Sequence, residues 1–536
     1  KRMGVIVKNL KEESYRLHMK GAPEVIAELC NPSTVPAEFA SVLSKYTQLG
    51  YRVLACATKV LPEVKFNALK ALNIKDIEKD LNFLGLIILQ NRLKSETIPA
   101  LESLREADIG VKMATGDNVL TGVAVGRECK IIPSGTDVFL CELEGGHLQW
   151  THLAYEALDS GKDKVLSSTR FSSPMPWLEK RSSNFVLAST GEAFSYLSTN
   201  SEELVVEALV TKGTVFARMA PEHKTLLVEK LQERKMLVGM CGDGANDCGA
   251  LKTADVGVSL SEAEASIAAP FTSRISNISC ILTVLREGRC ALTTSLQEFK
   301  FMALYSMIQF CSVTILYTFA VNLTDLQFLI IDLFMILPLV VCMSYTGPHH
   351  SLSKRMPTGT LMSISVLCSV ISQTILQFVF QVLAVVLVSL QSFYTEVDVG
   401  SSKEKSEVAE KSYCWENTAV VMASLYCYLI VCMVFSIGKP FKKPAYTNPY
   451  LTSALLICWV ALIWLTVYPQ DWIRHLFGLK PLPWDFRLEL LAICCCYAII
   501  SYVLERYLVP WMHEAYKRRQ AEKPLKQTDT QAGSIN

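Results

Sequence analysis

The stretch Leu237–Asp247, LVGMCGDGAND, decides the fold, because it joins a short apolar strand to a loop of glycines and carboxylates. Glycines let a backbone turn tightly beneath a phosphate, and Asp243 and Asp247 offer the hard oxygen atoms that Mg2+ prefers. Asn246 adds an amide donor. A turn chosen only for its backbone angles is the alternative interpretation. Two carboxylates at one strand end make that alternative the weaker one.

Two further features point to phosphate chemistry. Thr115-Gly116-Asp117 follows the apolar run Val111–Met113, where a hydroxyl and free backbone N–H groups can hold a phosphoryl group. Lys224 lies on a helix that Pro221 opens, and a lysine there can neutralise a transferred phosphate. By itself each feature is weak evidence of a site, because Thr-Gly-Asp also forms ordinary turns and a lone lysine is commonly a solvated surface residue. Their combination with the first loop indicates a phosphoryl-transfer site.

Short apolar strands alternate with helices in this part of the chain, which predicts a doubly wound parallel sheet with its chemistry at the carboxyl ends of the strands. The polar stretch Pro133–Arg181 reads as an insertion. The predicted strands are Val111–Met113, Phe185–Ala188, Val215–Ala217, Leu237–Met240 and Val256–Leu260, and the predicted helices are Ile98–Ala107, Leu120–Arg127 and Pro221–Gln232.

Composition limits the class of protein. A chain of 536 residues exceeds one hydrophobic core, and a net charge of +1 gives no global field that favours nucleic acid. The 18 cysteines show no zinc spacing and are interpreted as buried thiols in a reducing compartment. The apolar residues concentrate after Leu296, which separates a soluble half from a membrane half.

Six apolar segments of membrane-spanning length follow Leu296. Loop lysines and arginines gather on one side, which predicts that this side, with the soluble half, is cytoplasmic. A soluble helical bundle is the less favoured alternative. The predicted spans are Phe299–Val321, Leu326–Tyr345, Leu361–Leu390, Ala419–Ile437, Leu451–Val467 and Leu488–Leu508.

Polar side chains inside a span are costly and indicate a functional site. Tyr305 and Gln309 share one face of the first span, and Asp325, Phe328 and Asp332 share one face of the second. Packing between helices is an even alternative for Tyr305 and Gln309, and helix capping is one for Asp325. Asp332, deeper in its span, is the strongest candidate for a substrate pathway.

The threonine, lysine and aspartate loops together resemble haloacid-dehalogenase-like phosphotransferases, and over essentially the whole chain the order of motifs resembles the P-type ATPases. Lys20-Gly21-Ala22-Pro23-Glu24 resembles their nucleotide-domain motif. The resemblance implies a Rossmann-like phosphorylation domain, part of an α+β nucleotide domain, and six all-α membrane helices. It also implies ATP and Mg2+ as cofactors. The implied ATP contacts are Lys20, Gly21, Arg52 and Arg218; the implied Mg2+ ligands are Asp243 and Asp247; and the implied catalytic residues are Thr115, Gly116, Asp117, Lys224, Asn246 and Asp247.

Within that family the chain resembles the P5 subgroup in the segment Met240–Lys252. It resembles the P5B branch of polyamine-pump-like ATPases in the segments Pro270–Ser273 and Asp325–Asp332. The resemblance implies a cation substrate, with a polyamine favoured, and an endosomal, lysosomal or other endomembrane location. It extends the substrate pathway to Gln327, between Asp325 and Phe328. Gln90-Asn91-Arg92 stands where many pumps carry Asp-Pro-Pro, so no catalytic role is assigned there.

No Asp-Lys-Thr-Gly phosphorylation motif occurs in the chain, and Asp163-Lys164 is followed by valine. The resemblance therefore implies that the nucleophile lies upstream, in a half of the same pump that this chain requires. Thr190–Ala193 resembles a dephosphorylation motif but is interpreted as a strand-end turn. The implied domains are residues 1–93, the carboxyl-terminal part of the nucleotide domain; 94–290, the phosphorylation domain with an insertion at 133–181; 296–508, helices M5 to M10; and 509–536, a cytoplasmic polar tail.

The leading hypothesis is an ATP-driven cation transporter that is inactive as this chain alone. A membrane-tethered phosphatase would need its own nucleophilic aspartate two residues before an acid at a strand end, and the sequence offers none. Two more hypotheses stay open, namely a catalytically inactive isoform that binds a full-length pump and a pump for a metal cation.

Overall fold

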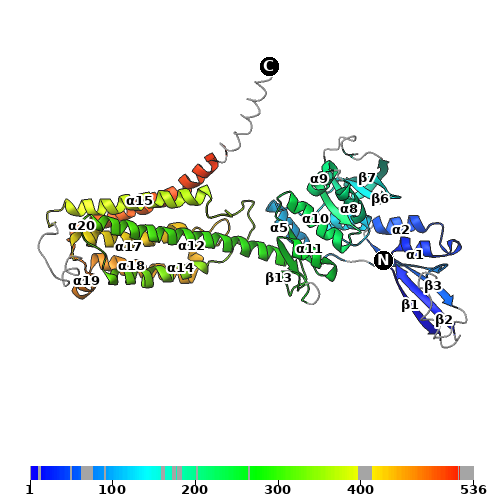
Figure 1. Ribbon diagram of the computed structural model, residues 1–536, viewed down its shortest axis with the longest axis horizontal. Helices are drawn as coiled ribbons and strands as arrows, with labels where there is room; N and C mark the ends of the chain where they lie inside the picture. The colour runs from blue at the N-terminus through cyan, green and yellow to red at the C-terminus, as the bar shows by residue number, and fades with distance from the viewer. Residues whose placement is uncertain are drawn as a thin grey trace, which may run out of the picture. The chain divides into compact units, whose positions relative to one another are not determined.

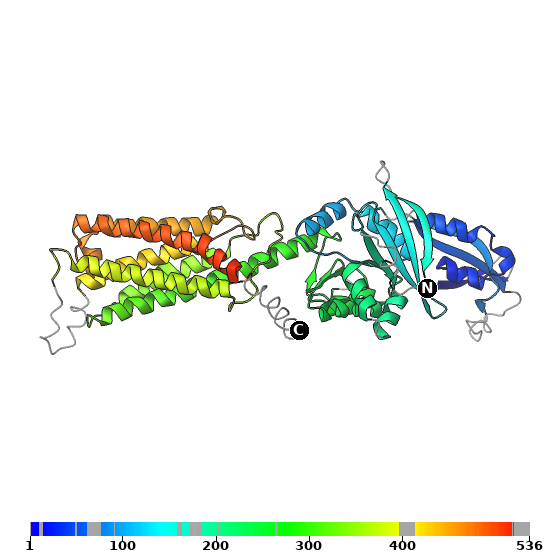
Figure 2. The ribbon, with the colours of Figure 1, turned by 90° about the horizontal axis from the view of Figure 1, so that it is seen from above.

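The computed structural model describes residues 2–9, 14–48, 51–61, 77–89, 92–157, 163–171, 175, 177, 184–200, 203–262, 266–395, 413–516 and 518. They divide into two compact units, Lys1–Thr283 and Val284–Asn536 (Figures 1 and 2). The expected fold class is confirmed: mixed α/β sheets come first and six long apolar helices follow. Residues 90 and 91 of the Gln90–Arg92 segment lie outside the described residues.

The first sheet of the soluble unit is antiparallel, with strand order β1-β2-β3-β4. Its strands are β1 (Arg2–Asn9), β2 (Ser14–Gly21), β3 (Arg52–Leu61) and β4 (Asn82–Leu89). Alternate residues of the central strands, such as Leu17 and Met19, are buried with Ile26 of helix α1 (Pro23–Leu29). The sheet therefore carries Lys20 and the start of α1 together. Segments η1 (Pro32–Thr34) and α2 (Phe39–Gln48) lie between α1 and β3 in the chain.

The second sheet has the strand order β5-β10-β9-β6-β7-β8. It is parallel from β5 to β6 and antiparallel from β6 to β8. Its strands are β5 (Met113–Ala114), β6 (Asp137–Glu144), β7 (His147–Ala157), β8 (Asp163–Phe171), β9 (Phe185–Thr190) and β10 (Gly213–Ala217). The stretch predicted as an insertion, 133–181, thus contributes strands to this sheet. The polar composition of this stretch gave no sign of strands, because β7 and β8 are antiparallel, and antiparallel strands can keep one face in contact with solvent.

Helices cover both faces of the second sheet. One buried cluster around Phe139, Phe194 and Phe216 packs under α8, α9 and α10, and another around Val123 and Val138 packs under α6. Figure 1 shows α8, α9 and α10 grouped beside β6 and β7. The helices are α5 (Thr97–Glu106), α6 (Val119–Glu128), α8 (Gly191–Thr199), α9 (Glu203–Lys212) and α10 (Pro221–Glu233).

A third, separate sheet is parallel and has the order β11-β12-β13. It consists of β11 (Gly239–Gly242), β12 (Val256–Ser259) and β13 (Phe271–Thr272), with η2 (Ala245–Asp247) and α11 (Cys248–Thr253) between the first two. The predicted parallel strands are therefore present, but in the described residues they fall into two sheets rather than one. β5 and β11 are edge strands of their sheets.

Six helices of the second unit are long and apolar enough to cross a membrane, which confirms the predicted spans and makes this a multi-pass membrane protein. Helix α17 (Trp415–Phe435) is almost wholly buried among the others, and both views show its neighbours running alongside it (Figures 1 and 2). The other spans are α12 (Ser279–Tyr317), α13 to α14 (Asp325–Ser344), α15 (Ile364–Ser389), α18 (Pro449–Val467) and the helix from α20 (Trp484–Val503) to Tyr516. Shorter segments are η4 (Ala445–Thr447) and α19 (Asp471–Phe477).

Two of these spans contain a π-helical segment that the sequence analysis did not anticipate. Segment η3 (Ile331–Ile336) precedes Pro338, and η5 (Leu504–Leu508) precedes Pro510. Proline has no N–H to donate to the carbonyl four residues earlier, which favours a local change of hydrogen-bonding pattern before it. The widened turns carry the two acidic residues Asp332 and Glu505.

Candidate functional site

The loops after β5 and β10 are joined by backbone hydrogen bonds. The N–H of Thr115 donates to the carbonyl of Phe216 over 2.8 Å, and the N–H of Met219 donates back to the carbonyl of Thr115 over 3.0 Å. Parallel strands end at the same edge of a sheet, so both loops lie together there. Thr115 also holds its own loop, because its Oγ1 accepts from the N–H of Asp117 at 3.1 Å. The predicted phosphate loop is thus ordered by its own hydrogen bonds.

Arg218 follows β10 in the left-handed conformation, with φ at 51°. Such a conformation is uncommon for a non-glycine residue and is held here by the N–H of Arg218, which donates to the carbonyl of Asp117 over 3.0 Å. The guanidinium Nη2 donates to both carboxylate oxygens of Glu24, at 3.0 and 3.1 Å. Asn118 donates to the same carboxylate over 3.4 Å.

A second contact joins the first sheet to this loop edge. Arg52, at the start of β3, lies 3.6 Å from the carboxylate of Asp117 in a pair whose side chains are 53% and 39% exposed. An exposed pair of this kind contributes little stability. Lys20 is exposed on β2, and the adjacent Gly21 is buried. The predicted nucleotide contacts Lys20, Gly21 and Arg52 therefore lie on two adjacent strands, and Arg52 also meets a residue that follows the second sheet.

The loop after β11 holds the second group of predicted residues. Lys224 on α10 donates to Asp247 over 2.6 Å, and both side chains are nearly buried, at 12% and 11% exposed. Asp247 packs against Gly242, where an added Cβ would lie 2.5 Å from the carboxylate. Asp243 and Asn246 of the same loop are exposed. Burial raises the pKa of the Cys241 thiol to about 12, so this cysteine stays protonated at neutral pH.

Among the described residues, no hydrogen bond or ion pair joins the Thr115–Asp117 loop to the Lys224–Asp247 pair. The predicted residues thus form two hydrogen-bonded clusters, one in the loops after β5 and β10 and one around the loop after β11. The first cluster includes the loop after β5 and the second the loop after β11, and each of these strands is at the edge of its sheet.

The donor set around β11 fits Mg2+, because Asp243 offers an exposed carboxylate and Asp247 a nearly buried one within a single short loop. Mg2+ commonly keeps several waters and takes one or two protein carboxylates. No group of three or more His, Cys, Asp or Glu side chains suited to a metal occurs within the described ranges.

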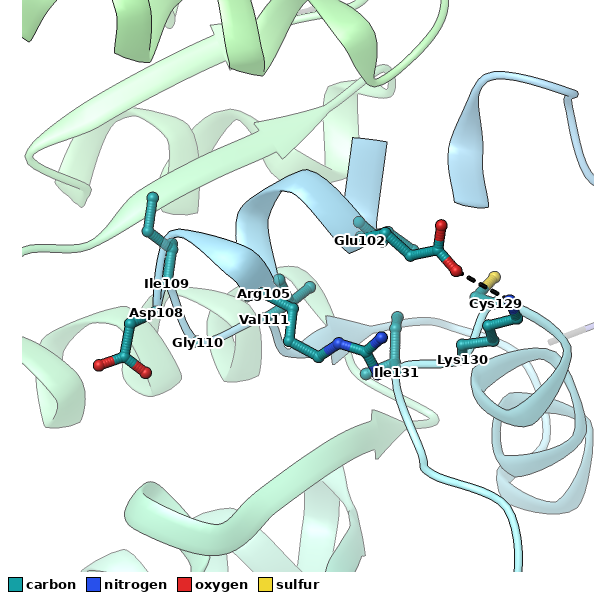
Figure 3. Close-up of a pocket in the computed structure, with 10 residues that line it drawn as sticks. Glu102, Arg105, Asp108, Ile109, Gly110, Val111, Cys129, Lys130 and Ile131 are labelled. Atoms are coloured by element: carbon teal, nitrogen blue, oxygen red, sulfur yellow. Dashed lines mark hydrogen bonds and ion pairs between the residues drawn. The ribbon is translucent and has the colours of Figure 1, made fainter. Parts of the chain in front are cut away.

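A pocket beside α5 does not belong to either cluster. It lies between the end of α5 and the segment after α6, where Glu102 and Lys130 form an ion pair at 2.8 Å (Figure 3). None of the predicted site residues lines it. This pocket therefore contributes nothing to the candidate phosphate chemistry.

In the membrane unit, Asp332 accepts hydrogen bonds from two side chains of another helix, α12. The hydroxyl of Tyr305 donates to its Oδ1 over 2.5 Å, and the Nε2 of Gln309 donates to the same oxygen over 3.0 Å. Tyr305 also packs near Tyr428, with ring centroids 5.8 Å apart. The sequence pattern placed Tyr305 and Gln309 on one face of their helix, and the structure shows that this face meets Asp332.

The remaining predicted pathway residues have different surroundings. Thr324 caps α13, with its Oγ1 accepting from the N–H of Gln327 while Gln327 Oε1 accepts from the N–H of Thr324. The Nε2 of Gln327 donates to the carbonyl of Phe477 over 2.8 Å, so the amide of this buried residue is used in the fold. Asp325 lies in the first turn of α13, and Phe328 packs against the membrane core.

Sequence reasoning missed two charged residues near these sites. Glu24 belongs to the Lys20–Glu24 motif, yet only the fold shows that it binds Arg218. Glu505 is buried and forms an ion pair with Lys300 of α12. A carboxylate near the end of the last apolar span was the available signal for Glu505.

Two family models match the chain. One, described as P-type ATPase, cytoplasmic domain N, matches residues 1–96, and the other, described as Cation transporting ATPase, C-terminus, matches residues 320–507.

Similar curated proteins cover nearly all of this chain. The Vacuolar cation-transporting ATPase YPK9 of Saccharomyces cerevisiae is 38% identical over 98% of the chain and 36% of its own length. The Polyamine-transporting ATPase 13A3 of Macaca fascicularis is 39% identical over 95% of the chain and 44% of its own length. The Polyamine-transporting ATPase 13A2 of Homo sapiens is 39% identical over 98% of the chain and 45% of its own length. The chain thus spans less than half the length of these relatives.

Proposed function

Because this chain belongs to the P5 subgroup of the P-type ATPases, we propose that it is part of an ATP-driven pump that moves a polyamine across a membrane. The family establishes a cation-transporting ATPase, and the polyamine is our inference. The observation that carries it is the convergence of Tyr305 and Gln309 on Asp332 inside a membrane span. A carboxylate with an aromatic and an amide beside it suits an ammonium group.

An elongated polycation fits this span better than a compact metal ion. Asp325 and Asp332 lie seven residues apart on the same span, with Phe328 between them, which separates the carboxylates by about 10 Å along a helix. Two ammonium groups of one molecule could each meet one carboxylate while the aromatic ring covers the methylenes. A Ca2+ site needs several oxygens within one coordination sphere. Two polyamine-transporting relatives support the same choice.

The soluble unit would supply the phosphoryl-transfer machinery. Lys20, Gly21 and Arg52 would contact ATP, and Arg218 would do so once its ion pair with Glu24 opens. Thr115, Gly116, Asp117 and Asn246 would hold the transferred phosphoryl group through hydroxyl, amide and N–H donors. Lys224 would neutralise its charge. Asp243 and Asp247 would hold Mg2+, which would neutralise phosphate charge when bound.

The acceptor carboxylate must come from a sequence beyond this one, since the 536 residues contain no Asp-Lys-Thr-Gly motif. We therefore expect that the purified chain forms no acyl-phosphate and does not turn over ATP, because phosphoryl transfer needs its acceptor in line. Acid-stable label on this chain after incubation with radiolabelled ATP would contradict this expectation. The cytoplasmic placement of the soluble unit rests on the loop charges, and the vacuolar relative supports an endosomal, lysosomal or other endomembrane location.

The substrate is tested in a protein that joins this chain to an upstream Asp-Lys-Thr-Gly segment. Spermine should stimulate its ATPase activity, and Asp332→Asn should abolish the stimulation while phosphorylation by ATP persists. Asp471→Asn, which changes an 81% exposed carboxylate of the same unit, serves as the matched control and should leave stimulation unchanged. Stimulation by a divalent metal with no response to spermine would refute the polyamine and leave the pump assignment standing.

A further inference from the structure

Four polar side chains repeat at every fourth position of α15, and all four are fully buried: Ser369, Gln373, Gln377 and Gln381. Residues four apart lie above one another on a helix, so they form one continuous row, here called the polar ladder. Glutamine inside a membrane bundle is costly without a hydrogen-bond partner, and a leucine of similar size would pack without that cost. The partners of the ladder therefore indicate what it does.

The first half of the ladder faces the last span. Ser369 donates to Glu505 over 2.7 Å, and Gln373 exchanges two hydrogen bonds with Ser501, at 2.8 and 3.0 Å. Glu505 also pairs with Lys300. Both ends of the Gln373 amide are used, so this half ties α15 firmly to the last span.

The second half faces α12 and is held less completely. Gln381 accepts from the hydroxyl of Ser312 at 3.2 Å and donates to the carbonyl of Ile308 over 3.5 Å. Gln377 donates to the sulfur of Cys311 at 3.1 Å, and within the described structure its buried Oε1 has no hydrogen-bond partner. These contacts lie within three residues of Gln309, on the turns of α12 that also carry Tyr305.

We propose that Gln377 and Gln381 are positioning residues that set the rotation of α12 about its axis, so that Tyr305 and Gln309 reach Asp332. A rotation of about 20° moves atoms at the edge of a helix of radius about 5–6 Å by about 2 Å. That displacement is enough to lose the 2.5 and 3.0 Å hydrogen bonds to Asp332. The expected effect on cation binding rests on the proposed function, whereas the effect on helix orientation does not.

The test compares two glutamines of the same helix with equal burial. Gln381→Leu removes a contact to α12, and Gln373→Leu, the matched control, removes a contact to the last span. Calorimetric titration of spermine into the full 536-residue chain in lipid nanodiscs should show about fivefold weaker binding for Gln381→Leu, as loss of one hydrogen bond predicts. Gln373→Leu should stay within about twofold of the unaltered chain, although both variants lose thermal stability.

Ser312→Ala provides a second variant for the same contact. It should also weaken spermine binding. Combining it with Gln381→Leu should weaken binding little further, because both changes remove the same hydrogen bond between Ser312 and Gln381. Equal weakening by Gln373→Leu and Gln381→Leu would overturn the proposal, since a general loss of packing then explains both.

A second measurement needs no cation. Spin labels introduced at Phe310 and Leu329, which are 64% and 53% exposed, report the distance between α12 and α13. The distance should shift by about 2 Å or broaden in Gln381→Leu and stay unchanged in Gln373→Leu. An unchanged distance in both variants overturns the positioning role. Failure of the unaltered chain to bind spermine, together with the expected shift, refutes the polyamine alone.

Discussion

Removing the ammonium of Lys224 should loosen the whole loop after β11. The ion pair with Asp247 spans 2.6 Å between side chains that are 12% and 11% exposed, and at an effective dielectric of about 20 its Coulomb attraction is about 6 kcal/mol. Desolvation of both charges offsets much of that attraction. Breaking a buried pair costs about 3–5 kcal/mol, and the residual exposure here reduces the expected cost of Lys224→Met to about 2–4 kcal/mol.

Hydrogen exchange measured by mass spectrometry is suited to this local effect. A loss of about 2–4 kcal/mol corresponds to about 30- to 1000-fold faster exchange in peptides that cover 239–253, while peptides of the membrane helices serve as an internal reference. Lys230→Met is the matched control, because Lys230 lies on the same helix and pairs with Glu233, whose side chain is 54% exposed. It should cost about 0.3–0.5 kcal/mol.

The double variant Lys224→Met with Asp247→Asn sharpens the test. With no charge left buried, most of the protection should return. Exchange in Lys224→Met no faster than in Lys230→Met, or no recovery in the double variant, would refute the reasoning that the pair stabilises this loop.

Three further predictions concern stability. Gly191→Ala should destabilise the soluble unit by about 1–3 kcal/mol, since an added Cβ would lie 2.3 Å from His223; thermal melting measures it, and an unchanged melt would contradict the close packing. Thr324→Ala should cost about 1 kcal/mol by removing the cap of α13, seen as faster exchange there, with Thr324→Ser as the conservative control. Burial lowers the pKa of Lys112 from 10.5 to about 8, so between these values the unfolded chain binds more protons and stability rises with pH. Lys112→Met should remove this rise, which amounts to about 3 kcal/mol across that pH range and so to about 6–12 °C in melting temperature; identical slopes would refute it.

Local patterns predicted the elements with short-range causes. The predicted strands at 185–188 and 215–217 lie in β9 and β10, the one predicted at 256–260 runs one residue past β12, and Pro221 opens α10 as a first-turn proline should. The membrane spans were equally accessible, because length and apolarity are properties of a continuous segment. Tyr305 and Gln309 could be assigned to one helix face from their spacing alone.

The pairing of these elements depends on contacts between segments far apart in the chain. No local pattern revealed that β6 lies beside β9, or that the strands occupy two sheets. The same holds for Glu24, which meets Arg218 across 194 positions, and for Asp332, whose two partners come from another span.

Residue type and spacing by themselves thus established the α/β loops, the six spans and the family to which the chain belongs, because each of these depends on residues that are close together in the sequence. Tertiary packing alone decided which oxygen of which helix each donor reaches. The polar ladder shows why: its four positions are identical in spacing and burial, yet one half binds the last span and the other binds α12. That difference arises from the helices that surround α15, and a sequence pattern within α15 contains no information about them.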